Sequence, residues 1–445
     1  MKLGSLLFGL LALVASGLLQ AYPLDDQETG IRRLEGARLS VLKQASVRYP
    51  YQPSGALLKK QYVELRLLKY PNMDLPKPDP AFTAEVTQLL GANKDAYGIA
   101  VLDLSDPADP RYAEYRGEAT QNVGSVGKLV AVLGLFQALA DVYPNDIDAR
   151  KRVLHDTVIT ADSFIRNDSH DVHFWNPETR TMVKRPLEIG DQGNLWEWLD
   201  WMMSPSSNAA ASTVMKQAML IRHFGTAYPV SDADASAFFR KTPKSKLRKL
   251  YIETFEEPIS RNGLNRKKLR QGSFFTRYGK GMVPGVTSYG SARALLLYCL
   301  RMEEGRLVDP FSSREIKRLM YVTERRIRYA SSMAFLEAAV YFKSGSLYSC
   351  RPEAGFECEK YHGNVLNSMN SVAIVEAPAG VGRVDYIVSL VSNVLRKNSA
   401  VDHQTLGTRL HRLIEKAHPA PKEAADDYKT FSKTLIGYDE KGRRR

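Results

Sequence analysis

Cysteine and metal-binding patterns are scarce in this sequence of 445 residues, which contains three cysteines and eight histidines. Cys299, in the apolar run ARALLLYCL, is interpreted as a buried helical thiol. Cys350 and Cys358 bracket the turn-rich segment RPEAGFE and are candidates for a disulfide, with free thiols as the alternative. The histidines form no H-x-H-x-D or H-E-x-x-H pattern, and His170 and His173 in DSHDVHF are predicted to lie in a polar surface loop. We therefore expect no metal site and no cofactor.

A membrane-spanning segment is not predicted anywhere after the first 21 residues, MKLGSLLFGLLALVASGLLQA. These residues combine one lysine near the start, an uncharged leucine-rich run and a small residue at Ala21, which is the order expected of a secretory signal peptide. We therefore predict an exported protein, periplasmic or secreted, with cleavage after Ala21. An uncleaved membrane anchor is the alternative.

Acidic residues are fewer than basic ones: the sequence has 49 Asp and Glu and 62 Lys and Arg, which gives a net charge of +13. The excess gathers in the basic insert Arg240–Leu250, in Arg261–Arg270 and in the terminal KGRRR. For an exported protein, this charge suggests contact with an anionic cell wall or a membrane surface, and nucleic acid is not an expected partner. The simpler interpretation is a solvated basic helix face.

The order of predicted elements indicates an α+β fold. Strands are predicted at 96–106 and 111–117 and again at 339–350, 370–378 and 384–394, and a closing helix at 404–417. Between the two groups of strands, helical patterns cover 125–142, 195–203, 208–224, 288–304 and 312–325. This order predicts a five-stranded antiparallel sheet flanked by helices, with an all-α subdomain inserted at about 125–330.

Four segments follow from this pattern: the signal peptide 1–21, an N-terminal helical extension 22–93, a main domain 94–418 and a basic C-terminal tail 419–445. Within the extension, helical patterns are predicted at 30–45 and 55–70.

The stretch QNVGSVGKLVAVLGLFQALA, residues 121–140, places glycines and a lysine before a long apolar run. It is not a phosphate-binding loop. That motif needs a Ser or Thr directly after Gly-Lys, where this chain has Leu129, and a second Gly five residues before the Gly of Gly-Lys, where it has Asn122. Ser125 and Lys128 instead form a Ser-x-x-Lys pattern at a helix start, with both side chains on one face. A neutral lysine there can accept the proton of the serine hydroxyl and make it a nucleophile.

Two further motifs follow in order. MMSPSSNAAAS contains Ser206 and Asn208 just before a helix, and YFKSGSLYS contains Lys343 and Gly345 in a predicted edge strand. This set resembles the penicillin-recognising serine enzymes, which are β-lactamases and penicillin-binding transpeptidases or carboxypeptidases with S-x-x-K, S-D-N and K-T-G elements. The resemblance covers about residues 94–418 and implies the serine β-lactamase/DD-peptidase-like fold.

The resemblance implies three catalytic residues. Ser125 is the acylated nucleophile, Lys128 is its base, and Ser206 relays a proton to the leaving nitrogen. It also implies substrate-binding residues: Asn208 holds an amide side chain, Lys343 and Ser344 bind a carboxylate, and Gly345 lets the backbone approach. The backbone amides of Ser125 and Ser346 would form an oxyanion hole.

The sequence departs from the family pattern at three positions. Ser207 stands where aspartate is typical, and Ser344 where threonine is typical. Class A β-lactamases carry a glutamate after the second motif that activates the water that hydrolyses the acyl-enzyme, and the best match here, RNGLNRKK, has Gly263 at that position. Glu253, Glu256 and Glu257 are weaker candidates for the same role. Acylation is therefore expected, with slow release.

Three functions stay open. The first is a class A-like serine β-lactamase that hydrolyses β-lactams through a Ser125 acyl-enzyme. The second is a penicillin-binding DD-carboxypeptidase or peptidoglycan amidohydrolase, which the missing glutamate favours. The third is a catalytically weak cell-wall-binding protein.

Overall fold

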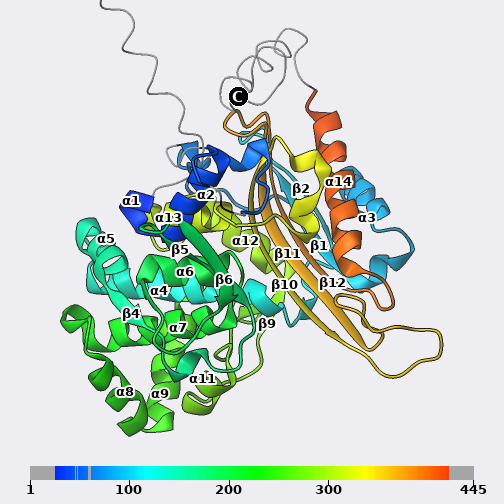
Figure 1. The fold of residues 1–445 in the computed structure, drawn as a ribbon. Coiled ribbons are helices and arrows are strands. Elements are labelled where there is room, and N and C mark those ends of the chain that lie inside the picture. Colours follow the sequence, from blue (N-terminus) through cyan, green and yellow to red (C-terminus); the bar gives the residue numbers. More distant parts are fainter. Residues whose placement is uncertain (1–25, 46, 48, 59–61, 420–445) are drawn as a thin grey trace, which may run out of the picture.

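A five-stranded antiparallel sheet forms the centre of the fold (Figure 1). The computed structural model describes residues 26–45, 47, 49–58 and 62–419, so the predicted signal peptide and almost all of the predicted basic tail lie outside the described residues. The strands stand in the order β10 (Ala339–Ser349), β11 (Leu366–Ala377), β12 (Val384–Asn393), β1 (Tyr97–Asp103) and β2 (Arg111–Tyr115). The α+β fold class is confirmed, since strands from the two ends of the sequence pair as β1 with β12.

Helices cover both faces of this sheet because its strands are apolar on both sides. Ile99 and Val101 of β1 pack toward α3 (Pro80–Leu89) and α14 (Ser399–Ala417), whereas Ala100 and Leu102 join the core that includes α12 (Ala292–Glu303) and α13 (Pro310–Tyr321). Successive side chains of a strand point to opposite faces, so one strand contributes to two cores. The short helices η3 (Gly91–Ala96), η8 (Arg328–Ser331) and η9 (Met333–Phe335) complete this half of the molecule.

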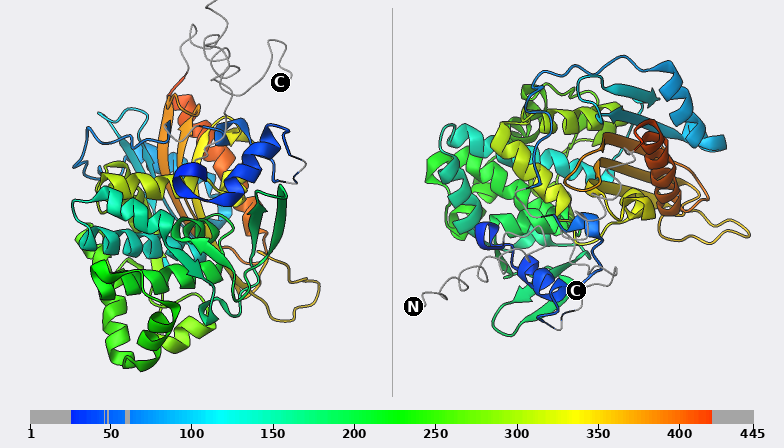
Figure 2. Two further views of the ribbon diagram at one scale, coloured as in Figure 1. Left: turned by 60° about the vertical axis from the view of Figure 1, so that its left-hand side comes forward. Right: turned by 90° about the horizontal axis from the view of Figure 1, so that it is seen from above.

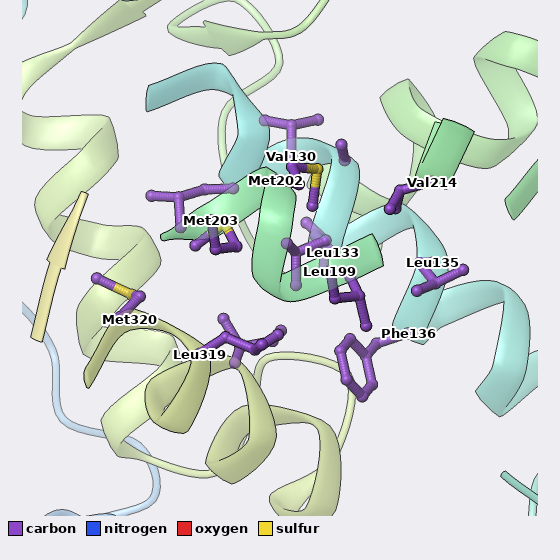
Figure 3. Close-up of a cluster of buried hydrophobic side chains, with 14 of the residues drawn as sticks. Val130, Leu133, Leu135, Phe136, Leu199, Met202, Met203, Val214, Leu319 and Met320 are labelled. Atoms are coloured by element: carbon purple, nitrogen blue, oxygen red, sulfur yellow. The ribbon is translucent and has the colours of Figure 1, made fainter. Parts of the chain in front are cut away.

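A helical block follows β2 in the chain and packs beside the sheet (Figure 2). Its central helix α4 (Lys128–Val142) is apolar nearly all round and is enclosed by α6 (Leu195–Met203), α7 (Asn208–Phe224) and α13, as Figure 3 shows. The remaining helices of the block are α5 (Ile147–Asp156), η5 (Ser163–Ile165), η6 (Gly225–Ala227), α8 (Asp232–Lys241), α9 (Lys244–Tyr251), the π-helix η7 (Ile252–Glu256), α10 (Glu257–Arg261) and α11 (Arg277–Met282). Contrary to expectation, one later segment, Gly124–Val142, has the length and composition of a membrane span, but it is mostly buried, as suits a core helix.

The block also contains short strands that the helical patterns did not predict. Strands β5 (Asp171–Asn176) and β6 (Thr181–Pro186) form a hairpin, and the other pairings are β4 (Val158–Thr160) with β7 (Gln192–Asn194), and β9 (Tyr289–Ser291) with both β3 (Thr120–Gln121) and β8 (Leu269–Arg270). The predicted surface loop around His173 is therefore wrong. His173 is buried on β5 and its ring nitrogen lies 2.6 Å from a carboxylate oxygen of Glu324. The predicted helix 312–325 also ends early, at Tyr321.

The N-terminal region is only partly helical. Helices α1 (Asp26–Thr29) and α2 (Arg32–Val41) are followed by the short helix η1 (Ser54–Ala56), and the predicted helix over 55–70 is wrong for the residues described. Val63, Leu65 and Leu67 are buried in alternation, which is the pattern of an extended segment, and the N–H of Leu67 bonds the carbonyl of Glu303. Tertiary contacts with α12 therefore override the local helical pattern.

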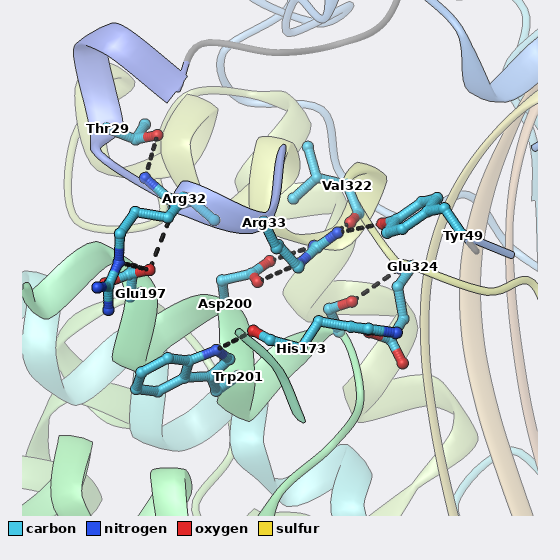
Figure 4. A network of polar contacts seen from close by, with 12 residues as sticks. Thr29, Arg32, Arg33, Tyr49, His173, Glu197, Asp200, Trp201, Val322 and Glu324 are labelled. Atoms are coloured by element: carbon cyan, nitrogen blue, oxygen red, sulfur yellow. Dashed lines mark hydrogen bonds and ion pairs between the residues drawn. The ribbon is translucent and has the colours of Figure 1, made fainter. Parts of the chain in front are cut away.

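A buried ion pair fixes α2 to the helical block (Figure 4). The guanidinium of Arg33 donates to both carboxylate oxygens of Asp200 on α6 and to the carbonyl of Val322, which follows α13. Tyr49 accepts a further bond from the same side chain. Because the loss of one partner leaves a buried charge uncompensated, this cluster ties the N-terminal region to the block that carries the motifs.

Candidate active site

Ser125 and Lys128 lie at the boundary between the sheet and the helical block. Ser125 is on the short helix η4 (Gly124–Gly127), which runs directly into α4 at Lys128. The Lys128 Nζ atom lies 3.0 Å from the Ser125 Oγ atom, so the predicted placement on one face brings the two groups into hydrogen-bond contact.

The second motif meets the same lysine. Lys128 Nζ donates to the carbonyl of Ser206 at 2.6 Å, and it lies 3.2 Å from Ser206 Oγ and 2.9 Å from the side-chain oxygen of Asn208. Ser206 has a φ of 68°, a left-handed conformation that a non-glycine residue adopts only when its surroundings fix it. This conformation turns both its carbonyl and its hydroxyl toward Lys128.

The third motif completes the cluster from the edge strand β10. Lys343 Nζ lies 2.8 Å from Ser206 Oγ, so the Ser206 hydroxyl stands between two lysines. At Gly345, a Cβ atom would lie 2.2 Å from the carbonyl oxygen of Val123 and 2.5 Å from the amide nitrogen of Ser125. Only glycine lets β10 approach η4 this closely.

Burial changes the protonation of both lysines. Lys128 is fully buried, and this desolvation lowers its pKa to about 7. The negative charge of Asp168 partly opposes the shift, and the positive charge of Arg328 adds to it. Burial likewise lowers the pKa of Lys343 well below its ordinary value, with the positive charges of Lys128 and Arg328 acting in the same direction. Near neutral pH a large share of Lys128 is thus neutral and able to accept a proton.

Three positions at the site were missed by sequence reasoning. Arg328, on η8, donates to Ser344 Oγ at 2.7 Å, to Ser346 Oγ at 3.0 Å and to Tyr361 Oη at 2.9 Å. Tyr361, which accepts the last of these bonds, is the second position. The third is Asp168, whose carboxylate accepts a hydrogen bond from the Ser207 hydroxyl. No local pattern distinguishes Arg328 among the arginines of ERRIRY, and only tertiary structure brings these residues to the motifs.

Gly263 does not lie beside the nucleophile, so its assignment to the glutamate position does not fit the structure. It forms a turn after α10 with a φ of 72°, and its neighbour Asn262 bonds the side chain of Gln137. Gln137 lies nine residues after Lys128 on α4, a distance of about 14 Å along the helix. Glu253 and Glu256 are ion-paired with Lys249 and Arg248.

A later part of the same loop faces the site instead. A Cβ atom at Gly127 would lie 2.1 Å from the side-chain oxygen of Gln271, and the ring centre of Phe275 lies 4.9 Å from Lys128 Nζ. Within residues 26–419 as described, Asp168 is the one carboxylate whose charge acts on the pKa of Lys128. An amide and an aromatic ring, and no carboxylate, are thus the side chains that this loop places beside the Ser125–Lys128 pair in the described residues.

Cys350 and Cys358 form a disulfide in the loop between β10 and β11, and Cys299 is a buried free thiol. The described residues contain no group of three or more His, Cys, Asp or Glu side chains arranged to hold a metal ion.

Among solved structures, the chain is similar to PBP-A and to several β-lactamases. The structure of PBP-A is 13% identical, with 78% of this chain and 100% of that chain covered and a TM-score of 0.47. A β-lactamase from Chitinophaga pinensis is 17% identical, with coverage of 75% and 98% and a TM-score of 0.48, and one from Sphaerobacter thermophilus is 11% identical, with coverage of 76% and 98% and a TM-score of 0.47. No protein-family model and no curated protein matches the sequence. The functional argument therefore depends on the chain's own residues.

Proposed function

We propose that this chain is an exported serine hydrolase of the penicillin-recognising type, which forms an acyl-enzyme on Ser125 with β-lactams or peptidoglycan peptides. The observation that carries the proposal is the contact between Ser125 Oγ and Lys128 Nζ, at 3.0 Å, with the lysine pKa lowered by burial to about 7. A lysine in that state is a suitable general base for a serine nucleophile.

The proposed reaction begins when neutral Lys128 takes the hydroxyl proton of Ser125. The Ser125 oxygen attacks the substrate amide carbon, and the backbone N–H groups of Ser125 and Ser346 stabilise the resulting oxyanion. Ser206, which lies within hydrogen-bond distance of both Lys128 and Lys343, donates its proton to the leaving nitrogen and regains one from a lysine. The carbon–nitrogen bond breaks, and an ester on Ser125 remains until water hydrolyses it.

Substrate binding is proposed along the edge strand β10. The hydroxyls of Ser344 and Ser346 and the guanidinium of Arg328 form one contiguous donor set, beside Lys343. Such a set suits a substrate carboxylate, which accepts several hydrogen bonds from a cationic partner. Asn208, at the start of α7, accepts a hydrogen bond from Lys128 and is the proposed partner of the substrate's amide group.

Slow release of the acyl group follows from the surroundings of Lys128. Its described hydrogen-bond partners are hydroxyl, carbonyl and amide oxygens, with no carboxylate among them. Without a carboxylate to activate water, the ester on Ser125 should persist, as in a penicillin-binding protein, rather than turn over rapidly as in a β-lactamase.

Labelling with a fluorescent penicillin tests this proposal. We expect stable labelling of the wild-type protein and none of Ser125→Ala, with unchanged circular dichroism. Rapid gain and loss of label would instead identify a β-lactamase. A folded wild-type protein that takes up no label would reject both enzyme functions and leave the wall-binding function.

A second proposed activity is contact with anionic wall polymers through the basic loop after α10. A cavity of about 440 Å³ there is lined by Arg266, Lys267, Arg270 and Tyr289, among others. Lys267 and Arg270 have no ion pair among the described residues, whereas Arg266 is ion-paired with Glu256. Co-sedimentation with purified cell walls at low salt should therefore fall when Lys267 and Arg270 are changed to Gln; unchanged sedimentation would contradict the proposal.

A further inference from the structure

Asp168 is a buried carboxylate that joins two parts of the site. It lies in the loop between η5 and β5, and its side chain is 4% exposed. One oxygen accepts from the Ser207 hydroxyl and from the backbone N–H of Ala209, both at 2.8 Å. The other oxygen lies 2.6 Å from Nδ1 of His170. Burial alone would raise the pKa of Asp168, but its partners lower it below the ordinary value, so the group is an anion.

The segment that Asp168 contacts carries strain. Ser206 has its left-handed φ, and Ser207 caps α7 by accepting from the backbone N–H of Ala210 at 3.1 Å. Asp168 orients the Ser207 hydroxyl for this cap and adds a negative charge at the N-terminus of α7, where the helix dipole favours it. Together these bonds fix the backbone from Ser206 to Ala209.

We propose that Asp168 is a positioning residue for Ser206 and Asn208, supplying from a neighbouring loop the carboxylate that the S-D-N element carries in its own second residue. Ser207 occupies the second position of the S-x-N motif in this chain, and its hydroxyl donates a hydrogen bond to the carboxylate of Asp168. The inference rests on the proposed function, because Ser206 and Asn208 matter through the acylation of Ser125.

Asp168 has a second effect, through its charge. Lys128 is faced by Asp168 from the loop before β5, by Lys343 from β10 and by Arg328 from η8. Asp168 is the negative member of this group and raises the pKa of Lys128, while Arg328 lowers it. The loss of this carboxylate therefore extends the neutral form of Lys128 to lower pH.

Two variants of Asp168 test the proposal first, with Asp171→Ala as the matched control because Asp171 is an exposed aspartate only three residues away. Asp168→Ala should reduce the rate of penicillin labelling about 10- to 100-fold, a loss comparable to that of one hydrogen bond to a charged group. The labelling rate rises with pH as Lys128 loses its proton. In Asp168→Asn this rise should occur at a lower pH than in the wild type. A purely structural role would reduce the rate equally at every pH and would overturn the electrostatic part.

An exchange of the two side chains separates positioning from general damage. Ser207→Asp alone places two carboxylates together and should reduce labelling, as Asp168→Ser does, whereas the double variant restores a single carboxylate at the start of α7. We expect the double variant to recover most of the wild-type rate. A double variant no better than either single variant would overturn the proposal.

Hydrogen exchange makes the test independent of catalysis. In Asp168→Ala the backbone amides of Ala209 and Ala210 should exchange at least about 10-fold faster than in the wild type, and Asp171→Ala should leave them unchanged. Unchanged exchange in Asp168→Ala would overturn the positioning role. If the wild type takes up no penicillin, the proposed function fails, and the exchange rates still decide whether Asp168 orders this segment.

Discussion

Two fully buried lysines in this protein have opposite surroundings. Lys317, in the core between α13 and the sheet, lies 2.7 Å from a carboxylate oxygen of Glu303 and 2.7 Å from one of Glu376. Burial would lower its pKa, but these charges raise it above the ordinary value, so it stays protonated. Lys128 is buried to the same extent and contacts only uncharged oxygens, and its pKa falls to about 7.

The contrast shows that burial alone does not make a lysine reactive. Desolvation acts on both side chains, and the presence or absence of adjacent carboxylates decides which protonation state is stable. The cluster around Lys317 connects α12, α13 and β11 as a charged unit, whereas Lys128 is left with a proton that it can exchange with Ser125 and Ser206. The following predictions test this division between a structural and a reactive lysine.

The largest expected effect is on acylation. Lys128→Met removes the base and keeps a similar buried volume, so the rate of penicillin labelling should fall about 10²- to 10⁴-fold with the fold intact. Labelling kinetics and thermal unfolding measure the two quantities. A labelling rate within a few-fold of the wild type would show that another group accepts the Ser125 proton.

The matched change in the other core should act on stability instead. Lys317→Met leaves Glu303 buried without its cation and Glu376 with Arg66 alone, which should lower the free energy of unfolding by about 3–5 kcal/mol. Denaturant unfolding measures this loss. The labelling rate per folded molecule should stay near the wild-type value, and a loss of rate without a loss of stability would remove the distinction between the two lysines.

Much of the fold could be predicted from the sequence, because the periodicity of apolar residues in a long segment indicates both its secondary structure and its buried face. The helices at 195–203 and 208–224 and the strand at 339–350 agree with the structure within one residue. The segment 55–70 could not be predicted in this way, since its alternating buried residues depend on α12, which lies far away in the sequence.

The candidate site was predictable where its chemistry is local. Ser125 and Lys128 are three residues apart on one helical face, and their contact follows from that spacing. Asp168 and Arg328 reach the site through tertiary packing, so their presence there could not be predicted from the spacing of residues in the sequence. Gly263 was misplaced for the same reason, because the path of the loop after α10 is set by contacts such as that of Asn262 with Gln137.

The pH dependence of acylation sharpens the comparison further. Lys128 must be neutral to act as a base, so the labelling rate should rise about tenfold per pH unit below 7 and level off above it. Lys317, whose pKa is raised, does not lose its proton in this range. Rates measured from pH 5 to 9 check this, and a rate independent of pH would contradict a lysine base.

The smallest expected effect belongs to Arg328, which contributes a positive charge near Lys128 and donors near Ser344. In Arg328→Gln the pKa of Lys128 should rise, because a charge that lowers it is removed, and the rise of the labelling rate should move to higher pH. Substrates with a carboxylate should also bind about tenfold more weakly, through the loss of charged hydrogen bonds. Arg325→Gln, a nearby exposed arginine, is the control and should change neither quantity. If Arg328→Gln weakens binding but leaves the pH profile in place, the state of Lys128 depends on burial and Asp168 alone, and Arg328 belongs only to the binding of substrate.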